Sequence, residues 1–126
     1  MTVTMPIRLV SEANMREHWF VKNKRKKQQQ AIVQACWISE GMNRVEWKFP
    51  LRITFTRIGA RKMDSDNLAG SGKAVRDELA KLLGVNDGDE TKVTWHYQQR
   101  IGKRGEYAVE IEVKPVDTLG VNVEAK

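Results

Sequence analysis

The sequence has few of the residues that form disulfides or bind zinc, and it has no long apolar segment of the kind that spans a membrane. It contains one cysteine and two histidines among 126 residues. Because Cys36 has no intrachain partner for a disulfide, we expect a reducing, cytoplasmic setting. Two histidines are too few to indicate a zinc site. No apolar run approaches the roughly 20 residues of a membrane span, and the N-terminal residues do not resemble a signal peptide, so no membrane partner is expected.

Proline is also rare, with three residues, and there is no internal repeat or low-complexity linker. This uniformity predicts one domain over residues 1–126, with a tail after Pro115 that shows little pattern and is expected to fray. The apolar fraction of 40% and the charged fraction of 30% are typical of a globular domain with a single core.

Apolar periodicity predicts an α+β domain with about four strands in a small mixed sheet and two helices packed on one face. The expected order is strand, helix, strand, helix, strand, strand. The predicted strands are residues 7–12, 51–59, 93–100 and 107–115, and the predicted helices are residues 14–40 and a segment that ends at Gly84. Gly102 and Gly105 separate the last two strands, which predicts a hairpin.

Positive charge is concentrated near the N-terminus. The formal net charge is +6, and five of the six residues from Lys22 to Lys27 are basic. Such a run is usually a solvated helix face, but it is also the electrostatic footprint of a nucleic-acid binder. Of the tryptophans, Trp37 and Trp95 fit core positions, whereas Trp19 and Trp47 fit either the core or stacking on unpaired bases.

Two acidic groups flank the second helix. Asp64 and Asp66 follow the strand at 51–59, and in an extended backbone residues i and i+2 point to the same side. Asp87, Asp89 and Glu90 follow the helix, which carries the chain back by roughly 16 Å, so the groups meet only if the loops fold back. Converging carboxylates repel one another, and oxygen-only ligands suit Mg²⁺ or Mn²⁺.

Other interpretations of the acidic residues are weaker or remain open. An EF-hand loop that starts at Asp64 fails, because Leu68 and Ala69 occupy its fifth and sixth positions. A Walker loop fails, because the Gly spacing is wrong and no hydroxyl residue follows Lys73. The simplest alternative remains open: one aspartate caps a helix, and residues 86–89 form a turn.

The spacing of these residues resembles that of the RusA family of Holliday junction resolvases, which is found in phages and prophages. The matching residues are Asp64-Ser65-Asp66-Asn67-Leu68, Lys73-Ala74-Val75-Arg76-Asp77, Gly84-Val85 and Asp87-Gly88-Asp89. The match is strong over about 30 residues and loose elsewhere.

The resemblance implies a homodimer in a bacterial cell that binds four-way DNA junctions and cuts paired strands with Mg²⁺ or Mn²⁺. It implies metal ligands at Asp64, Asp66 and Asp89, with Asp87 as a rival for the third position. It also implies that Lys73 is catalytic and balances charge at the phosphate or positions the attacking water. The basic residues expected to contact DNA are Arg16, Lys22, Lys24, Arg25, Lys26, Lys27, Arg61 and Lys62.

The chain departs from the family pattern at one place. The family lysine follows the second aspartate by four residues, whereas Lys73 follows Asp66 by seven, and the excess is equivalent to Gly70-Ser71-Gly72. Two glycines weaken a helix by about 1 kcal/mol each, so we expect a loop or loose first turn there and a helix that begins near Ser71. The extra residues motivate an alternative function, a non-catalytic DNA-binding module with the same fold.

Overall fold

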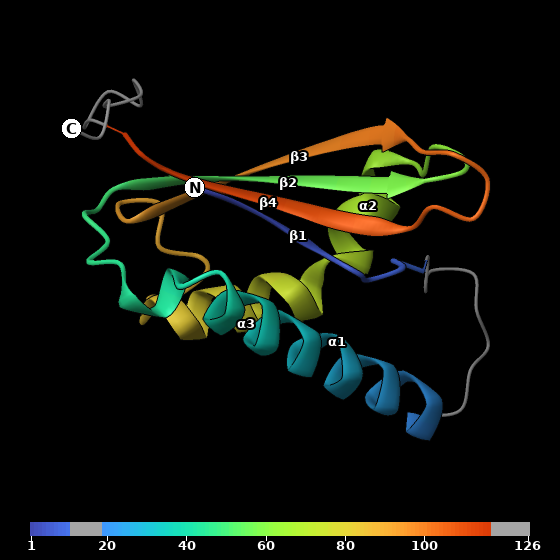
Figure 1. Cartoon of the computed structure of the whole chain (residues 1–126), viewed down its shortest axis with the longest axis horizontal. Coiled ribbons are helices and arrows are strands. Elements are labelled where there is room, and N and C mark those ends of the chain that lie inside the picture. The colour runs from blue at the N-terminus through green and yellow to red at the C-terminus, as the bar shows by residue number, and fades with distance from the viewer. Residues whose placement is uncertain (11–18, 117–126) are drawn as a thin grey trace.

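The computed structural model describes residues 1–10 and 19–116, and Figure 1 shows one sheet with helices along one of its faces. The elements are β1 (Thr2–Met5), α1 (Trp19–Ser39), the 3₁₀ helix η1 (Met42–Arg44), β2 (Leu51–Gly59), α2 (Ser65–Ser71), α3 (Lys73–Leu83), β3 (Val93–Ile101) and β4 (Ala108–Pro115). This arrangement confirms the predicted α+β class with a small mixed sheet. It contains three α-helices in these residues, because Ser65–Ser71, which precedes the predicted second helix, forms a short helix of its own. None of the helices described is long and apolar enough to cross a membrane.

The sheet has the strand order β1-β4-β2-β3. Strand β4 is antiparallel to β1 and β2, whereas β3 is parallel to β2, with Leu51 opposite Val93. The predicted hairpin of the last two strands is therefore wrong, because β2 lies between them. Their six-residue connection is longer than a tight hairpin turn and spans the two inter-strand spacings, roughly 10 Å, across the end of β2. The amide of Gly102 donates to the Gly59 carbonyl at 3.0 Å during this crossing.

The first strand also differs from the prediction of residues 7–12. It spans Thr2–Met5 and buries Val3 and Met5, and Pro6, which has no N–H to donate, follows it directly. Ile7 and Leu9 are nevertheless buried, which explains why they resembled strand residues. The first helix is confirmed from Trp19 to Ser39, while residues 11–18 lie outside the described part of the chain.

The core lies between the sheet and the helices. Side chains of all four strands line the helix-facing side, and one row across the sheet is Val3, Ile111, Phe55 and Tyr97. Helices α1 and α3 pack against each other beneath it (Figure 1). Helix α1 contributes Val33 and Trp37 to the core, and α3 contributes Val75 and Leu79. The expected core position of Trp37 is confirmed.

The joint between α2 and α3 is the segment Gly70-Ser71-Gly72. The expectation of a loose loop is wrong, because Gly70 and Ser71 complete α2 and the Ser71 hydroxyl donates to the Leu68 carbonyl at 2.9 Å. The expectation that Lys73 starts the next helix is confirmed. Leu68 is buried and anchors the short α2 in the core. A Cβ on Gly72 would lie 2.8 Å from Cζ of Phe55, whereas a Cβ on Gly70 would meet nothing within 4 Å.

We expect Gly72→Ala to destabilise the protein by about 1–3 kcal/mol, because the new methyl group would push Phe55 out of its packed position. The matched variant Gly70→Ala should be neutral or stabilising by up to about 1 kcal/mol, since it replaces a helical glycine in open space. Urea unfolding followed by circular dichroism measures both values. Equal effects of the two substitutions would contradict a close approach at Gly72.

Candidate functional site

The loop that precedes Asp64 is held in place by a side chain of β3. Gln99 accepts a hydrogen bond from the Met63 amide at 2.7 Å, and its own amide donates to the Met63 carbonyl at 2.6 Å. Arg57 of β2 donates to the Arg61 carbonyl at 2.6 Å. Sequence reasoning missed Gln99 and Arg57. The available signal was at Arg57, the next helix-facing position after Leu51, Ile53 and Phe55, where an apolar residue would be expected.

Asp64 and Asp66 lie at the start of α2. Asp64 occupies the N-cap position with φ −59° and ψ 147°, but its side chain makes no capping hydrogen bond. The capping alternative is therefore wrong for Asp64, whose side chain is exposed. Asp66 is exposed in the first turn, where the helix dipole favours negative charge. Because Asp66 is helical, the expectation that an extended backbone aligns the two carboxylates is wrong.

Asp87 is committed to an ion pair within the fold. Its Oδ2 accepts hydrogen bonds from Nε and Nη2 of Arg76 at 3.0 and 2.8 Å. Arg76 also donates to the Tyr97 hydroxyl at 3.1 Å, and these two partners raise the pKa of the guanidinium, with Tyr97 as the larger cause. The Trp95 indole donates to the Asp87 carbonyl at 2.9 Å. This network ties α3 and the following turn to β3.

Asp89 is part of a local turn. Its Oδ1 accepts hydrogen bonds from the amide and the hydroxyl of Thr91, at 3.0 and 2.5 Å. The hydroxyl bond is the largest cause that lowers the pKa of Asp89 below its ordinary value. Asn86 accepts from the Gly88 amide at 2.9 Å, which confirms the turn interpretation of residues 86–89.

The two acidic groups lie along different parts of β3. Met63, next to Asp64, contacts Gln99, whereas Asp87 contacts Trp95. Trp95 and Gln99 are four residues apart on the strand, a separation of about 13 Å. Within residues 1–10 and 19–116, no group of three or more His, Cys, Asp or Glu side chains could hold a metal ion. Carboxylate oxygens are the donors that Mg²⁺ prefers, and Asp64 and Asp66 are the pair without a structural role of their own.

The basic residues of α1 meet the α2–α3 joint around a pocket of about 260 Å³. Lys22 and Lys26 line it from α1, and Lys73 lines it from the first turn of α3. The full lining is Trp19, Lys22, Asn23, Lys26, Gln29, Gly70, Ser71, Lys73, Ala74 and Asp77. The structure thus brings predicted DNA-contacting lysines together with the predicted catalytic lysine, which sequence spacing alone did not show.

Among the described residues, the other basic residues expected to contact DNA do not line this pocket. Lys24 and Lys27 are exposed on a neighbouring side of α1, and Arg61 and Lys62 are exposed in the loop before Asp64. Arg25 faces a second cavity, and Arg16 lies outside the described residues. At the start of α1, Trp19 is 65% exposed and its ring lies edge-on to that of Phe20, with 5.0 Å between centroids.

Comparison with known proteins leaves the family assignment as a prediction. No protein-family model matches the chain, and no curated protein matches it. The resemblance to the RusA family therefore rests on the residues of the motif between Asp64 and Asp89, together with the loose agreement of strand and helix order.

We expect Thr91→Val to raise the pKa of Asp89 towards its ordinary value, because the hydroxyl bond to the carboxylate is lost. A lowered folded-state pKa contributes stability that is present above the ordinary value and is lost as the pH falls through the folded value. NMR titration of the Asp89 carboxyl carbon measures the shift. Thr91→Ser keeps the hydroxyl and should leave the pKa low, and an unchanged value in Thr91→Val would contradict this assignment.

Proposed function

We propose that the protein binds branched DNA and, with Mg²⁺ or Mn²⁺, cuts it at four-way junctions. The observation that carries the proposal is the shared pocket of α1 and the α2–α3 joint, where Lys22, Lys26 and Lys73 surround one opening. Three ammonium groups from two helices, against the single carboxylate of Asp77, give the pocket a net positive lining. Such a site suits the phosphate backbone of a nucleic acid, whose neutralisation releases counterions and provides most of the affinity.

The exposed aromatic residues at the start of α1 favour a branched rather than a continuous duplex. Trp19 lines the same pocket as the lysines and is largely exposed. In an intact duplex the faces of the bases are covered by their neighbours, whereas at a branch point an unpaired base can stack on an indole ring. Lysines that hold phosphates beside a ring that accepts a base would therefore select a distorted strand.

The cleavage part of the proposal rests on Asp64 and Asp66. These residues would hold the metal ion, and the ion would supply a Lewis acid for the phosphate and for the attacking water. The chain itself fixes the approach to Asp64 through the two hydrogen bonds between Gln99 and Met63. Lys73 would stabilise negative charge on the phosphate. Paired cuts in two strands need two copies of the site, so the proposal includes a homodimer.

A second candidate is a non-catalytic DNA-binding module with this fold. It is favoured by the engagement of Asp87 with Arg76 and of Asp89 with Thr91, since both carboxylates already have protein partners. These contacts lower the number of carboxylates ready to bind a cation. A synthetic four-way junction incubated with the protein and Mg²⁺, beside a linear duplex of the same length, separates the two candidates.

We expect wild-type protein to cut the junction, and Asp66→Asn to abolish cleavage while it preserves or strengthens junction binding, because repulsion of the phosphates falls. Product gels and gel-shift titrations measure the two effects. Glu46→Gln removes an equally exposed carboxylate ahead of β2 and should cut normally. Intact binding by the wild-type protein without any product would establish the non-catalytic module, and loss of binding in Asp66→Asn would make that residue structural.

Lys26→Gln should weaken junction binding and lower the slope of log affinity against log salt by about 1, because one phosphate contact is removed. Lys81→Gln makes the same change of charge in the last turn of α3, outside the shared pocket, and serves as the matched control. Fluorescence anisotropy at several salt concentrations gives both slopes. Equal slopes for the two variants would show that net charge, and not the shared pocket, governs binding.

A further inference from the structure

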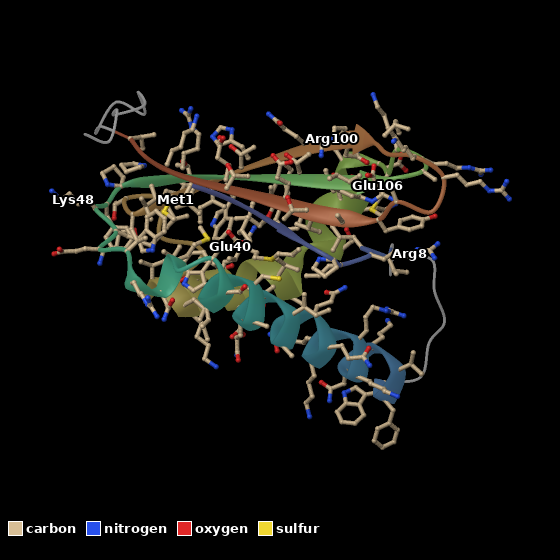
Figure 2. The ribbon with its side chains drawn as sticks, in the orientation of Figure 1. Met1, Arg8, Glu40, Lys48, Arg100 and Glu106 are labelled. Atoms are coloured by element: carbon tan, nitrogen blue, oxygen red, sulfur yellow. The ribbon has the colours of Figure 1, made fainter. Side chains whose placement is uncertain are left out.

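A second cavity, which we call the arginine pocket, lies beside the loop that leads to Asp64. Its volume is about 570 Å³, and it is lined by Arg8, Leu9, Val10, Arg25, Arg57, Ala60, Arg61, Met63 and Tyr107. Four of these nine residues are arginines, and none is acidic. The arginines come from the segment after β1, from α1, from β2 and from the loop after β2, so the tertiary fold gathers them. Figure 2 shows Arg8 where the chain leaves β1.

Arg57 is the buried member of this group. Only 8% of the residue is exposed. Arg57 is the next helix-facing residue of β2 after Leu51, Ile53 and Phe55. In the sheet it lies opposite Val109 and Gln99. Its guanidinium donates to the Arg61 carbonyl and, at 3.4 Å, to Oε1 of Gln99. Both acceptors are neutral oxygens, so these bonds satisfy N–H groups without neutralising the charge.

The backbone leaves room for this guanidinium. A Cβ on Gly59 would lie 2.7 Å from Nη2 of Arg57, so any larger residue there would displace the side chain. A buried cation is costly unless an anion compensates it. In the part of the chain that the structure describes, no ion pair joins Arg8, Arg57 or Arg61 to a carboxylate. Arg8 is instead held over the Tyr107 ring, 4.2 Å from its centroid.

We propose that the arginine pocket binds a phosphodiester of a nucleic-acid strand and thereby fixes that strand next to Asp64. The inference rests on the proposed DNA binding. Guanidinium groups match the geometry of phosphate oxygens, with two parallel N–H donors for each pair of oxygens. Met63 lines the pocket and immediately precedes Asp64, so a phosphate held here lies beside the residue next to Asp64. The anion also compensates the buried charge of Arg57.

The test compares Arg61→Gln with Arg44→Gln, which makes the same change in η1, beyond the far end of α1. Arg61 is exposed, so its substitution does not threaten folding. We expect Arg61→Gln to lower the affinity for a four-way junction on the order of tenfold and to reduce the salt slope by about 1, and Arg44→Gln to change neither. A second measurement titrates wild-type protein with inorganic phosphate, against chloride at equal ionic strength, and follows the arginine Nε–H resonances. Those of Arg57 and Arg61 should shift while that of Arg44 stays in place.

The outcomes separate this inference from the proposed function. If wild-type protein binds the junction but the two variants behave alike, the arginine pocket is not a phosphate site and DNA binding stands. If wild-type protein binds no DNA, the proposed function is wrong. A selective shift of Arg57 with inorganic phosphate would then identify a site for a free phosphate compound and overturn the nucleic-acid occupant.

Discussion

The parallel pairing of β2 with β3 is the constraint on which the rest of the structure depends. Parallel neighbours cannot be joined by a tight turn, so the chain must return along the sheet between them. Here α2 and α3 make that return, and they pack on the same face as α1. The helices that this pairing requires therefore add to the cover that α1 gives to one side of the sheet. The pairing also places Asp64 beyond the end of β2 and the turn that contains Asp87 and Asp89 before the start of β3.

This constraint has an electrostatic consequence. The acidic turn is tied to β3 by Arg76, which bridges Asp87 and Tyr97, and by the Trp95 indole, which donates to the Asp87 carbonyl. At the other side of the described structure, lysines line the cavity at the α2–α3 joint and arginines line the cavity beside the loop before Asp64. A chain of net charge +6 thus keeps one pair of exposed carboxylates, Asp64 and Asp66, among basic side chains. That contrast of charge is the physical basis for proposing phosphate chemistry there.

Local patterns predicted much of the fold. The alternation of Leu51, Ile53 and Phe55 predicted β2, and Gly84, which has a positive φ, ended α3 as expected. The pairing of the strands was not predictable in this way, because a six-residue connection permits either a hairpin or a crossing over β2. The candidate site likewise divides into residues that a local motif predicts and residues whose contacts depend on the tertiary fold. Asp64, Asp66 and Lys73 were predicted from a motif, whereas no motif marks Arg57 or Gln99. Gln99 holds Met63 across 36 positions of the sequence.

The contact between Gln99 and Met63 has a mechanical meaning. A side-chain amide offers one donor and one acceptor, and Gln99 uses both on the backbone of a single residue. Both bonds go to the Met63 backbone, so they do not depend on the Met63 side chain. The position of Asp64 is consequently transmitted from β3, so that any sliding of β3 against β2 would move the carboxylate with it. Asp64 at the surface is thus mechanically coupled to β3 of the sheet.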